Sequence, residues 1–271
     1  MKKIGITGGK GFIGKAAADW AIRDGHEVVF FDRPEHDVLG DLLAMRSCTH
    51  VIHLAGVLGT AELFDAAEIA IDVNIKGTLR ILEFCAANNI GFTGITMPPV
   101  FQSVYTATKV CADRLATAWH LSRNLKCSKV RAFNAYGSGQ KHGPGHPQKI
   151  IPTFATEAWA NRPIPVWGDG TQGVDLVHTE DLGRMLVEAT DFGDDEVFDG
   201  GTGVGLTVNE VAEFVLKVTG STAGIQYLPM RAGEVPTQIV AKGEGWEKLG
   251  WQPVHSWERL AECVVDYKPK E

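Results

Sequence analysis

Short apolar runs alternate with longer amphipathic segments through the first half of the chain. The apolar runs have the length of buried strands, and the longer segments repeat apolar residues at helical spacing. We expect strands at residues 4–6, 27–31, 50–56, 91–96 and 128–133, and helices at residues 16–23, 73–85 and 105–124. Strands that alternate with helices in this order predict an α/β fold built on a doubly wound parallel sheet.

A change of composition after Phe133 predicts a second, smaller lobe, because glycine, proline and histidine cluster in the following loop. Further elements are expected at residues 150–161, 162–170, 175–178 and 181–190. We assign residues 1–135, with 173–200 returning to them, to the first domain, and residues 136–172 and 201–271 to a C-terminal α/β lobe that binds substrate. Lobes that interleave in sequence favour a rigid cleft between them.

Charge and composition narrow the classes of partner. A net charge of −7 over 271 residues, without a basic cluster, argues against nucleic acid. No signal peptide or membrane span is visible, and the odd number of cysteines, five, has no CxxC pairing, so we expect a cytoplasmic protein with reduced thiols. His142 and His146 lack accompanying carboxylates or cysteines, so we expect no metal site there.

The segment 7–14 is a glycine-rich turn between the first strand and the first helix. Its glycines let backbone N–H groups approach a pyrophosphate closely. The residues expected to bind a dinucleotide here are Gly8, Gly11, Phe12, Ile13 and Gly14. The second strand ends in Asp32, whose carboxylate suits an adenosine ribose and repels a 2'-phosphate. NAD is therefore favoured over NADP, although the Arg33 guanidinium could bind that phosphate.

A tyrosine and a lysine stand four residues apart on one predicted helix, at Tyr105 and Lys109. A nearby ammonium and a positive nicotinamide ring both favour the tyrosinate, which lowers the phenol pKa toward the working range. Such a tyrosine can remove or return a hydroxyl proton. Downstream of a dinucleotide-binding turn, the pair predicts proton-transfer chemistry.

With these motifs the chain resembles the extended short-chain dehydrogenases/reductases, in the NAD-dependent epimerase/dehydratase group that acts on nucleotide sugars. That resemblance implies a Rossmann-type domain. The matching segments are 7–14, 53–56, 74–78, 105–109, 131–137, 168–172, 201–203 and 231–234.

The resemblance also implies residue roles. Tyr105 is the general base, and Lys109 orients it and holds the nicotinamide ribose. The remaining residues implied to contact the cofactor are Asp37, Val38, Leu54, Ala55, Gly56 and Asn74. Asp41-Leu42 is the alternative to Asp37-Val38, but it leaves little chain before the next strand. Asn134 and Arg231 are implied to bind the substrate's diphosphate, for which a guanidinium is suited.

The substrate end departs from the family pattern. Met97 stands where relatives carry the serine or threonine that hydrogen-bonds the reacting hydroxyl. Thr96 is the first candidate to replace it and Ser103 the second, although neighbouring strand residues point to opposite faces.

Two further departures concern the sugar and its phosphates. Pro98-Pro99 replaces the Asp-Glu pair of the sugar 4,6-dehydratases, and only residues 102–104 separate Phe101 from the tyrosine, which predicts a more open site. Val174 replaces a phosphate-binding arginine, and Lys141 or Arg162 could compensate.

These observations predict an NAD-dependent nucleotide-sugar epimerase acting at C4 of a UDP-hexose. The alternatives are a reductase, dehydratase or decarboxylase of the same family, or a non-catalytic protein that binds NAD or sugar nucleotides. By resemblance we also expect a homodimer formed through helices 74–88 and 105–123.

Overall fold

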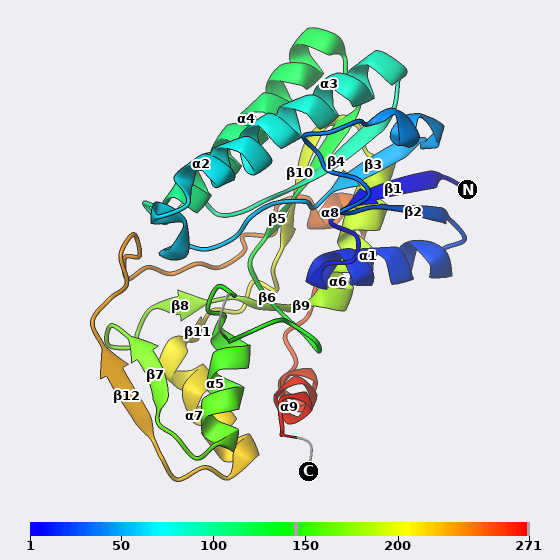
Figure 1. Cartoon of the computed structure of the whole chain (residues 1–271). Helices are drawn as coiled ribbons and strands as arrows, with labels where there is room; N and C mark the ends of the chain where they lie inside the picture. Colours follow the sequence, from blue (N-terminus) through cyan, green and yellow to red (C-terminus); the bar gives the residue numbers. More distant parts are fainter. Residues whose placement is uncertain (144–145, 270–271) are drawn as a thin grey trace.

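The computed structural model describes residues 1–143 and 146–269, and its largest sheet confirms the expected parallel α/β architecture (Figure 1). Six parallel strands lie in the order β10-β5-β4-β3-β1-β2. They are β1 (Lys3–Thr7), β2 (Glu27–Phe31), β3 (His50–His53), β4 (Gly91–Thr96), β5 (Cys127–Ala132) and β10 (Asp194–Gly200). The strand order reverses direction at β1, so the carboxyl ends of β1 and β3 form the switch point where such sheets bind ligands.

Helices cover both faces of this sheet. On one face α1 (Phe12–Arg23) and α6 (Thr179–Glu188) pack together over β1, β3, β5 and β10. On the other face lie α3 (Thr78–Asn88) and α4 (Val104–Arg123), which share a second apolar cluster with β2, β3, β4 and the loop after β2. Short 3-10 turns occupy Leu43–Ser47, Glu62–Phe64 and Ala189–Asp191.

The helix expected to begin at Val73 begins earlier. Helix α2 (Ala67–Ala70) continues through a π-helical segment, Ile71–Gly77, into α3. A π turn holds more residues than an α turn, so the apolar spacing of this stretch departs from the ordinary helical period. The helix ends at Asn88, three residues later than expected, and Asn89 adopts the left-handed conformation of a helix cap.

A second core lies beside the sheet. It packs α5 (Ile150–Trp159), α7 (Val208–Thr219) and α9 (Trp257–Asp266) against the parallel pair β7 (Ile164–Trp167) and β12 (Ile225–Leu228). Two small sheets connect it to the first core: β6 (Asn134–Tyr136) with β9 (Leu176–His178), and β8 (Gly173–Val174) with β11 (Leu206–Thr207). The residue boundaries of the two domains stay a prediction.

The C-terminal tryptophans are packing residues. Trp257 joins the second core, whereas Trp246 on α8 (Trp246–Leu249) and Trp251 pack against the first. All five cysteines are free thiols. Throughout residues 1–143 and 146–269, every helix is too short or too polar to span a bilayer.

Candidate active site

The glycine-rich turn is compact and lies against the end of β3. Gly8 has φ 70°, and a side chain there would come within 2.8 Å of the Ala55 backbone nitrogen. A side chain at Gly14 would come within 2.2 Å of the Gly8 carbonyl oxygen. Gly11 caps α1, so the N–H groups of Phe12, Ile13 and Gly14 belong to a first turn that has no acceptor within the helix. The turn therefore offers backbone donors at the switch point, as pyrophosphate binding requires.

Asp32 follows β2 and lies directly beside this turn. Its two carboxylate oxygens accept hydrogen bonds from the backbone nitrogen of Lys10, at 3.3 and 3.2 Å. Asp32 is half-buried, whereas Arg33 is exposed. The carboxylate is thus fixed next to the donors of the turn, and the guanidinium extends into solvent.

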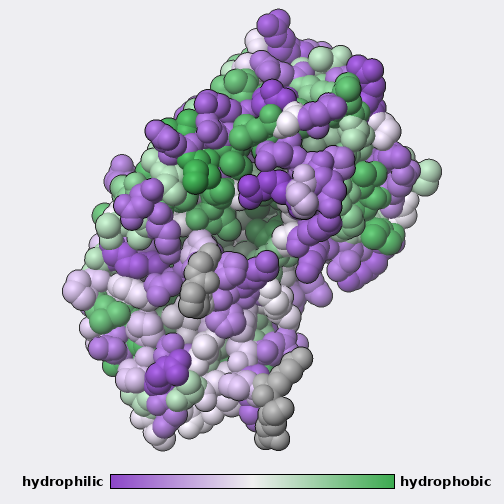
Figure 2. Space-filling view, viewed as in Figure 1, coloured by the Kyte–Doolittle hydropathy of each residue, from purple (hydrophilic) through white to green (hydrophobic). Residues whose placement is uncertain are grey.

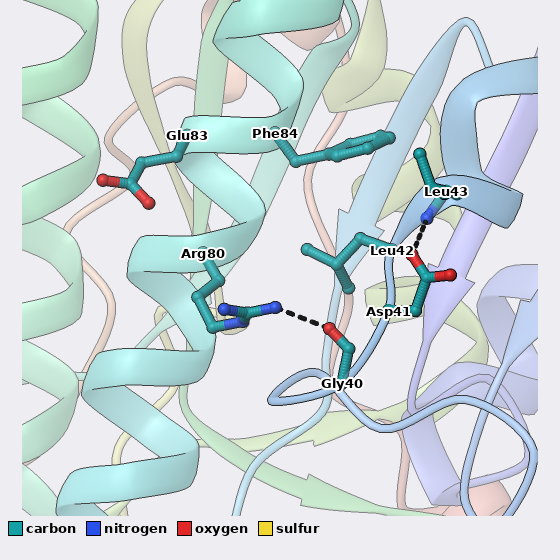
Figure 3. Close-up of a pocket in the computed structure, with 7 residues that line it drawn as sticks. All are labelled: Gly40, Asp41, Leu42, Leu43, Arg80, Glu83 and Phe84. Carbon is teal, nitrogen blue, oxygen red and sulfur yellow. Dashed lines mark hydrogen bonds between the residues drawn. The ribbon is translucent and has the colours of Figure 1, made fainter.

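The two candidate adenine-contacting pairs occupy different parts of the loop after β2. Val38 is buried against Gly77 at the start of α3, and its carbonyl oxygen accepts a hydrogen bond from Arg80 at 3.3 Å. Asp37 accepts a hydrogen bond from the Leu39 nitrogen within the loop. Asp41 and Leu42 instead line a surface cavity of about 380 Å³ against Arg80 and Phe84 (Figure 3). That cavity contains none of the residues predicted to do chemistry.

A chain of buried hydrogen bonds connects the ends of β1 and β3 with the helical segment that contains Asn74 and Thr78. Thr78 donates its hydroxyl proton to the Asn74 carbonyl (2.7 Å), so it accepts from His53 Nε2 (3.0 Å). His53 Nδ1 then accepts from Thr7 (2.7 Å), whose oxygen accepts from the backbone nitrogens of Leu54 and Ala55. Burial, together with the charge of Lys109, lowers the pKa of His53 to about 3 and keeps the ring neutral.

The Asn74 side chain clamps the loop after β3. Its Oδ1 accepts from the Val57 nitrogen (2.9 Å), and its Nδ2 donates to the Val57 carbonyl and to Thr108 on α4, both at 3.1 Å. Gly56 passes close to this amide. Asn74 therefore holds the 54–57 loop against α4.

Tyr105 and Lys109 lie in the first two turns of α4, as predicted. The lowered tyrosine pKa was expected with a positive nicotinamide ring beside it, and the protein by itself shows the opposite direction. Burial raises the pKa of Tyr105 to about 12, because a tyrosinate loses hydration there. Burial also lowers the pKa of Lys109 to about 8, because its ammonium loses hydration there. A further positive charge is needed to bring the phenol into the working range.

The two candidate hydroxyls differ in their surroundings. Ser103 is the N-cap of α4: its oxygen accepts from the Thr106 nitrogen (3.2 Å) and its proton goes to the Thr106 hydroxyl (3.1 Å). Thr96 is buried at the end of β4 and lines a small cavity together with Lys109. Capping already engages Ser103, so Thr96 is the freer of the two.

The residues expected to bind substrate come from β6 and the C-terminal loop. Asn134 begins β6 and is half-buried. Arg231 forms an ion pair with Glu234 and lies over the Trp167 ring, with the guanidinium carbon 4.8 Å from the ring centroid. Two residues further on, the Gly233 carbonyl accepts a hydrogen bond from the Gln102 nitrogen (3.1 Å). That bond brings the loop of Arg231 to the start of α4.

Val174, at the position of the missing arginine, is 8% exposed and packs in the second core. Of the suggested replacements, Arg162 is paired with Glu157 beyond the far end of α5, and Lys141 is exposed. The sequence reasoning missed Lys149, which immediately precedes α5. Its pKa is lowered by burial, and its charge interacts with Glu62, Arg231 and Glu234. Its position directly before the element expected at residues 150–161 was the available signal.

The surface is hollowed between the two cores (Figure 2). The model of the NAD dependent epimerase/dehydratase family matches residues 4–199. The chain belongs to this family. It is therefore an NAD-dependent enzyme of the extended short-chain dehydrogenase/reductase type, and its Rossmann-type fold agrees with that of solved family members.

The relatives of this epimerase/dehydratase family member include more than one activity. A UDP-glucose 4-epimerase of Corynebacterium glutamicum is 25% identical over 94% of this chain and 92% of its own length. A dTDP-glucose 4,6-dehydratase of Streptomyces niveus is 27% identical over 86% of this chain and 74% of its own length. The structure of a Thermotoga maritima UDP-glucose 4-epimerase with UDP-glucose has a TM-score of 0.89 and 26% identity, covering 98% of both chains.

Proposed function

We propose that the protein is an NAD-dependent nucleotide-sugar epimerase that inverts C4 of a UDP-hexose. The observation that carries this proposal is the junction of two parts of the site: the Gln102–Gly233 hydrogen bond joins the Arg231 loop to the helix of Tyr105 and Lys109. A diphosphate held at Arg231 would thus present its sugar near the tyrosine. The similarity to UDP-glucose 4-epimerases supports this choice of substrate.

The residues of the first domain suit NAD. The helix donors of Phe12, Ile13 and Gly14 would bind the pyrophosphate, and Asp32 would accept hydrogen bonds from the adenosine ribose. Val38 and Asp37 would contact the adenine, and Leu54 to Gly56 would line the path toward the nicotinamide. NADP is disfavoured, because its 2'-phosphate would meet the Asp32 carboxylate.

The chemistry assigned to this chain is proton transfer. Bound NAD would supply the acceptor and donor of a hydride at C4 of the sugar. Tyr105 Oη would remove the proton of the 4-hydroxyl as that carbon is oxidised to a ketone, and would return the proton when the ketone is reduced on its other face. Lys109 would favour the tyrosinate electrostatically, and Thr96 is the first candidate to hydrogen-bond the reacting oxygen.

Phosphate binding at this site would depend on two cations. Arg231 supplies a planar donor pair, and Lys149 supplies a second positive charge that interacts with Arg231 and Glu234. Asn134 would add a neutral donor. Glu234 and Glu62 compensate these charges in the protein, so the diphosphate would replace or share carboxylate contacts.

A 4,6-dehydratase is the second candidate, because a relative at 27% identity carries that activity. It is disfavoured, since Pro98 and Pro99 stand where the dehydratases have acidic residues, and the elimination needs an acid to protonate the departing hydroxyl. A reductase would consume NADH or NADPH in net amounts, and a decarboxylase would release carbon dioxide from a UDP-uronate.

The deciding experiment compares Tyr105→Phe with the parent on a panel of UDP-glucose, UDP-galactose, UDP-N-acetylglucosamine, UDP-glucuronate and dTDP-glucose. The matched control is Tyr227→Phe, whose side chain is exposed on β12. We expect the parent and the control to interconvert UDP-glucose and UDP-galactose without net NADH change, and Tyr105→Phe to lose about 10²- to 10⁴-fold in kcat. Equal conversion by parent and Tyr105→Phe, or a parent that purifies without any NAD(H), would reject the proposal.

We also propose a cytoplasmic homodimer formed through α3 and α4. The fully buried positions of both helices face the sheet, so the outward faces with Leu79 and Leu121 remain for a partner. Light scattering should give twice the 29.3 kDa chain mass. A monomer at micromolar concentration, or recovery outside the cytosolic fraction of cells, would contradict these two expectations.

A further inference from the structure

A lysine is buried in the central sheet behind the proposed catalytic helix. Lys129 lies in the middle of β5, and its side chain is 5% exposed. Its ammonium lies 3.0 Å from an Asp195 oxygen, 3.5 Å from an Asp113 oxygen and 2.9 Å from the Thr117 hydroxyl. Two carboxylates from different elements, α4 and β10, thus compensate one buried cation.

Such a cluster is costly, which argues for a role beyond packing. A buried charge loses hydration and is tolerated when partners hold it, and apolar residues of similar size would often be as stable. Asp195 reaches the lysine from a bulge in β10 with φ 60°, a conformation that is strained for a residue other than glycine. Cys127 and Thr117 both donate to its carboxylate, at 3.1 and 2.8 Å.

The cluster adjoins Lys109. Asp113 follows Lys109 by one helical turn on α4, so the two side chains share a face of the helix. Lys109, Asp113, Lys129 and Thr96 line a common cavity of about 20 Å³, a volume that fits a single water molecule. Burial disfavours the ammonium of Lys109 and lowers its pKa, and Asp113 opposes that effect.

In the part of the chain that the structure describes, several charged or titratable groups lie around Lys109. Asp113 and Tyr105 share its helix, Lys129 lies on β5 with Asp195 behind it, and His53 on β3 is neutral. Asp113 is the negative group of this set that lines the cavity, and Lys129 contacts its carboxylate. Without Lys129, Asp113 would be free to swing toward Lys109 and draw the ammonium away from the tyrosine.

We propose that Asp113, held by Lys129, is a positioning residue that keeps Lys109 charged and directed toward Tyr105 and the cofactor ribose. This inference rests on the proposed proton-transfer role of Tyr105 and Lys109. Asp113 acts through Lys109 and contacts neither substrate nor cofactor. Asp113 would supply the counter-charge, and the Lys109 ammonium would remain available to Tyr105 and to the ribose.

The test uses Asp113→Asn, Lys129→Met and, as a matched control, Asp191→Asn, which removes the exposed partner of Lys2. The first readout is the pH dependence of Lys109 modification by acetic anhydride, followed by mass spectrometry of the full-length protein's peptides, which requires no turnover. We expect Asp113→Asn to lower the apparent pKa of Lys109 by about one unit or more and Lys129→Met to raise it. The control should match the parent.

The second readout is kcat for UDP-galactose conversion as a function of pH. In Asp113→Asn the alkaline limb should move to lower pH in step with Lys109, and in Lys129→Met kcat should fall about tenfold or more at the optimum. An unchanged Lys109 pKa in a folded Asp113→Asn protein would overturn the inference even if the enzyme is an active epimerase. An inactive parent with a shifted Lys109 pKa would instead reject the proposed function.

Discussion

The backbone nitrogen of Gln102 donates a 3.1 Å hydrogen bond to the carbonyl oxygen of Gly233. Gln102 precedes the helix that carries Tyr105, and Gly233 lies in the loop that carries Arg231. The side chain of Phe64 packs close to Gly233 from a third segment. This backbone contact thus joins the segment of Tyr105 to the loop of Arg231, although the two are far apart in sequence.

Replacing Arg231 should therefore weaken substrate binding more than it slows the chemistry. Arg231→Ala removes a charge-assisted contact worth about 1.5–3 kcal/mol, so KM for UDP-glucose should rise about 10- to 100-fold with a smaller change in kcat. Steady-state kinetics measures this split. Arg162→Ala is the control, because its guanidinium is exposed and paired with Glu157. An equal rise in KM for both variants would contradict the assignment.

Adding a methyl group at Gly14 should disrupt the turn. In a helix interior alanine is normally favoured over glycine by about 1 kcal/mol, but here the new carbon would lie 2.2 Å from the Gly8 oxygen. We expect Gly14→Ala to lower the free energy of unfolding by about 1–3 kcal/mol and to weaken NAD binding. Urea denaturation and NAD titration measure both effects. Gly193→Ala, whose new carbon would lie 3.3 Å from a Lys126 side-chain atom, should be close to neutral.

Asp32 should decide the choice between the two nicotinamide cofactors. Asp32→Ala removes both a ribose acceptor and the charge that repels a 2'-phosphate, so NAD affinity should fall about tenfold and the preference for NAD over NADP should shrink. Fluorescence titration with each cofactor gives the ratio. Glu35→Ala removes a nearby exposed carboxylate and should leave it unchanged. Parent protein that prefers NADP would refute this prediction.

Two buried histidines should make the fold sensitive to mild acid. Burial lowers the pKa of His50 and of His53 to about 3. The unfolded chain binds protons on both rings below about pH 6.5, whereas the folded chain does not until about pH 3. Their contribution to stability is therefore complete above pH 6.5 and is lost as the pH falls toward 3.

Urea denaturation between pH 7 and pH 4 measures this effect. The two rings together should add about 2.7 kcal/mol per pH unit to the slope of the unfolding free energy. His50→Gln should remove about half of the slope that the two histidines add. His142→Gln, at an exposed position, should leave the slope unchanged. A free energy independent of pH between 6 and 4 would show that these histidines do not stay neutral.

The sequence determined the features that short segments specify. Strand length and helical period predicted the parallel sheet, because each strand and helix buries its own apolar residues. The glycine spacing predicted the turn, since φ 70° at Gly8 and the contact at Gly14 exclude other residues. The four-residue spacing alone predicted that Tyr105 and Lys109 lie on one helix face. The π-helical form of the Ile71–Gly77 segment was not predicted, because its period is longer than that of an α-helix.

Tertiary structure decided what depends on distant segments and on burial. It put Lys149 beside the charges of Arg231 and Glu234, and it brought Lys129 to Asp113 and Asp195. It also raised the pKa of Tyr105 in the protein by itself, because desolvation depends on everything packed around a phenol. Local pattern therefore specified the elements and the chemical groups. Their distances, partners and protonation depended on long-range packing, which no local spacing encodes.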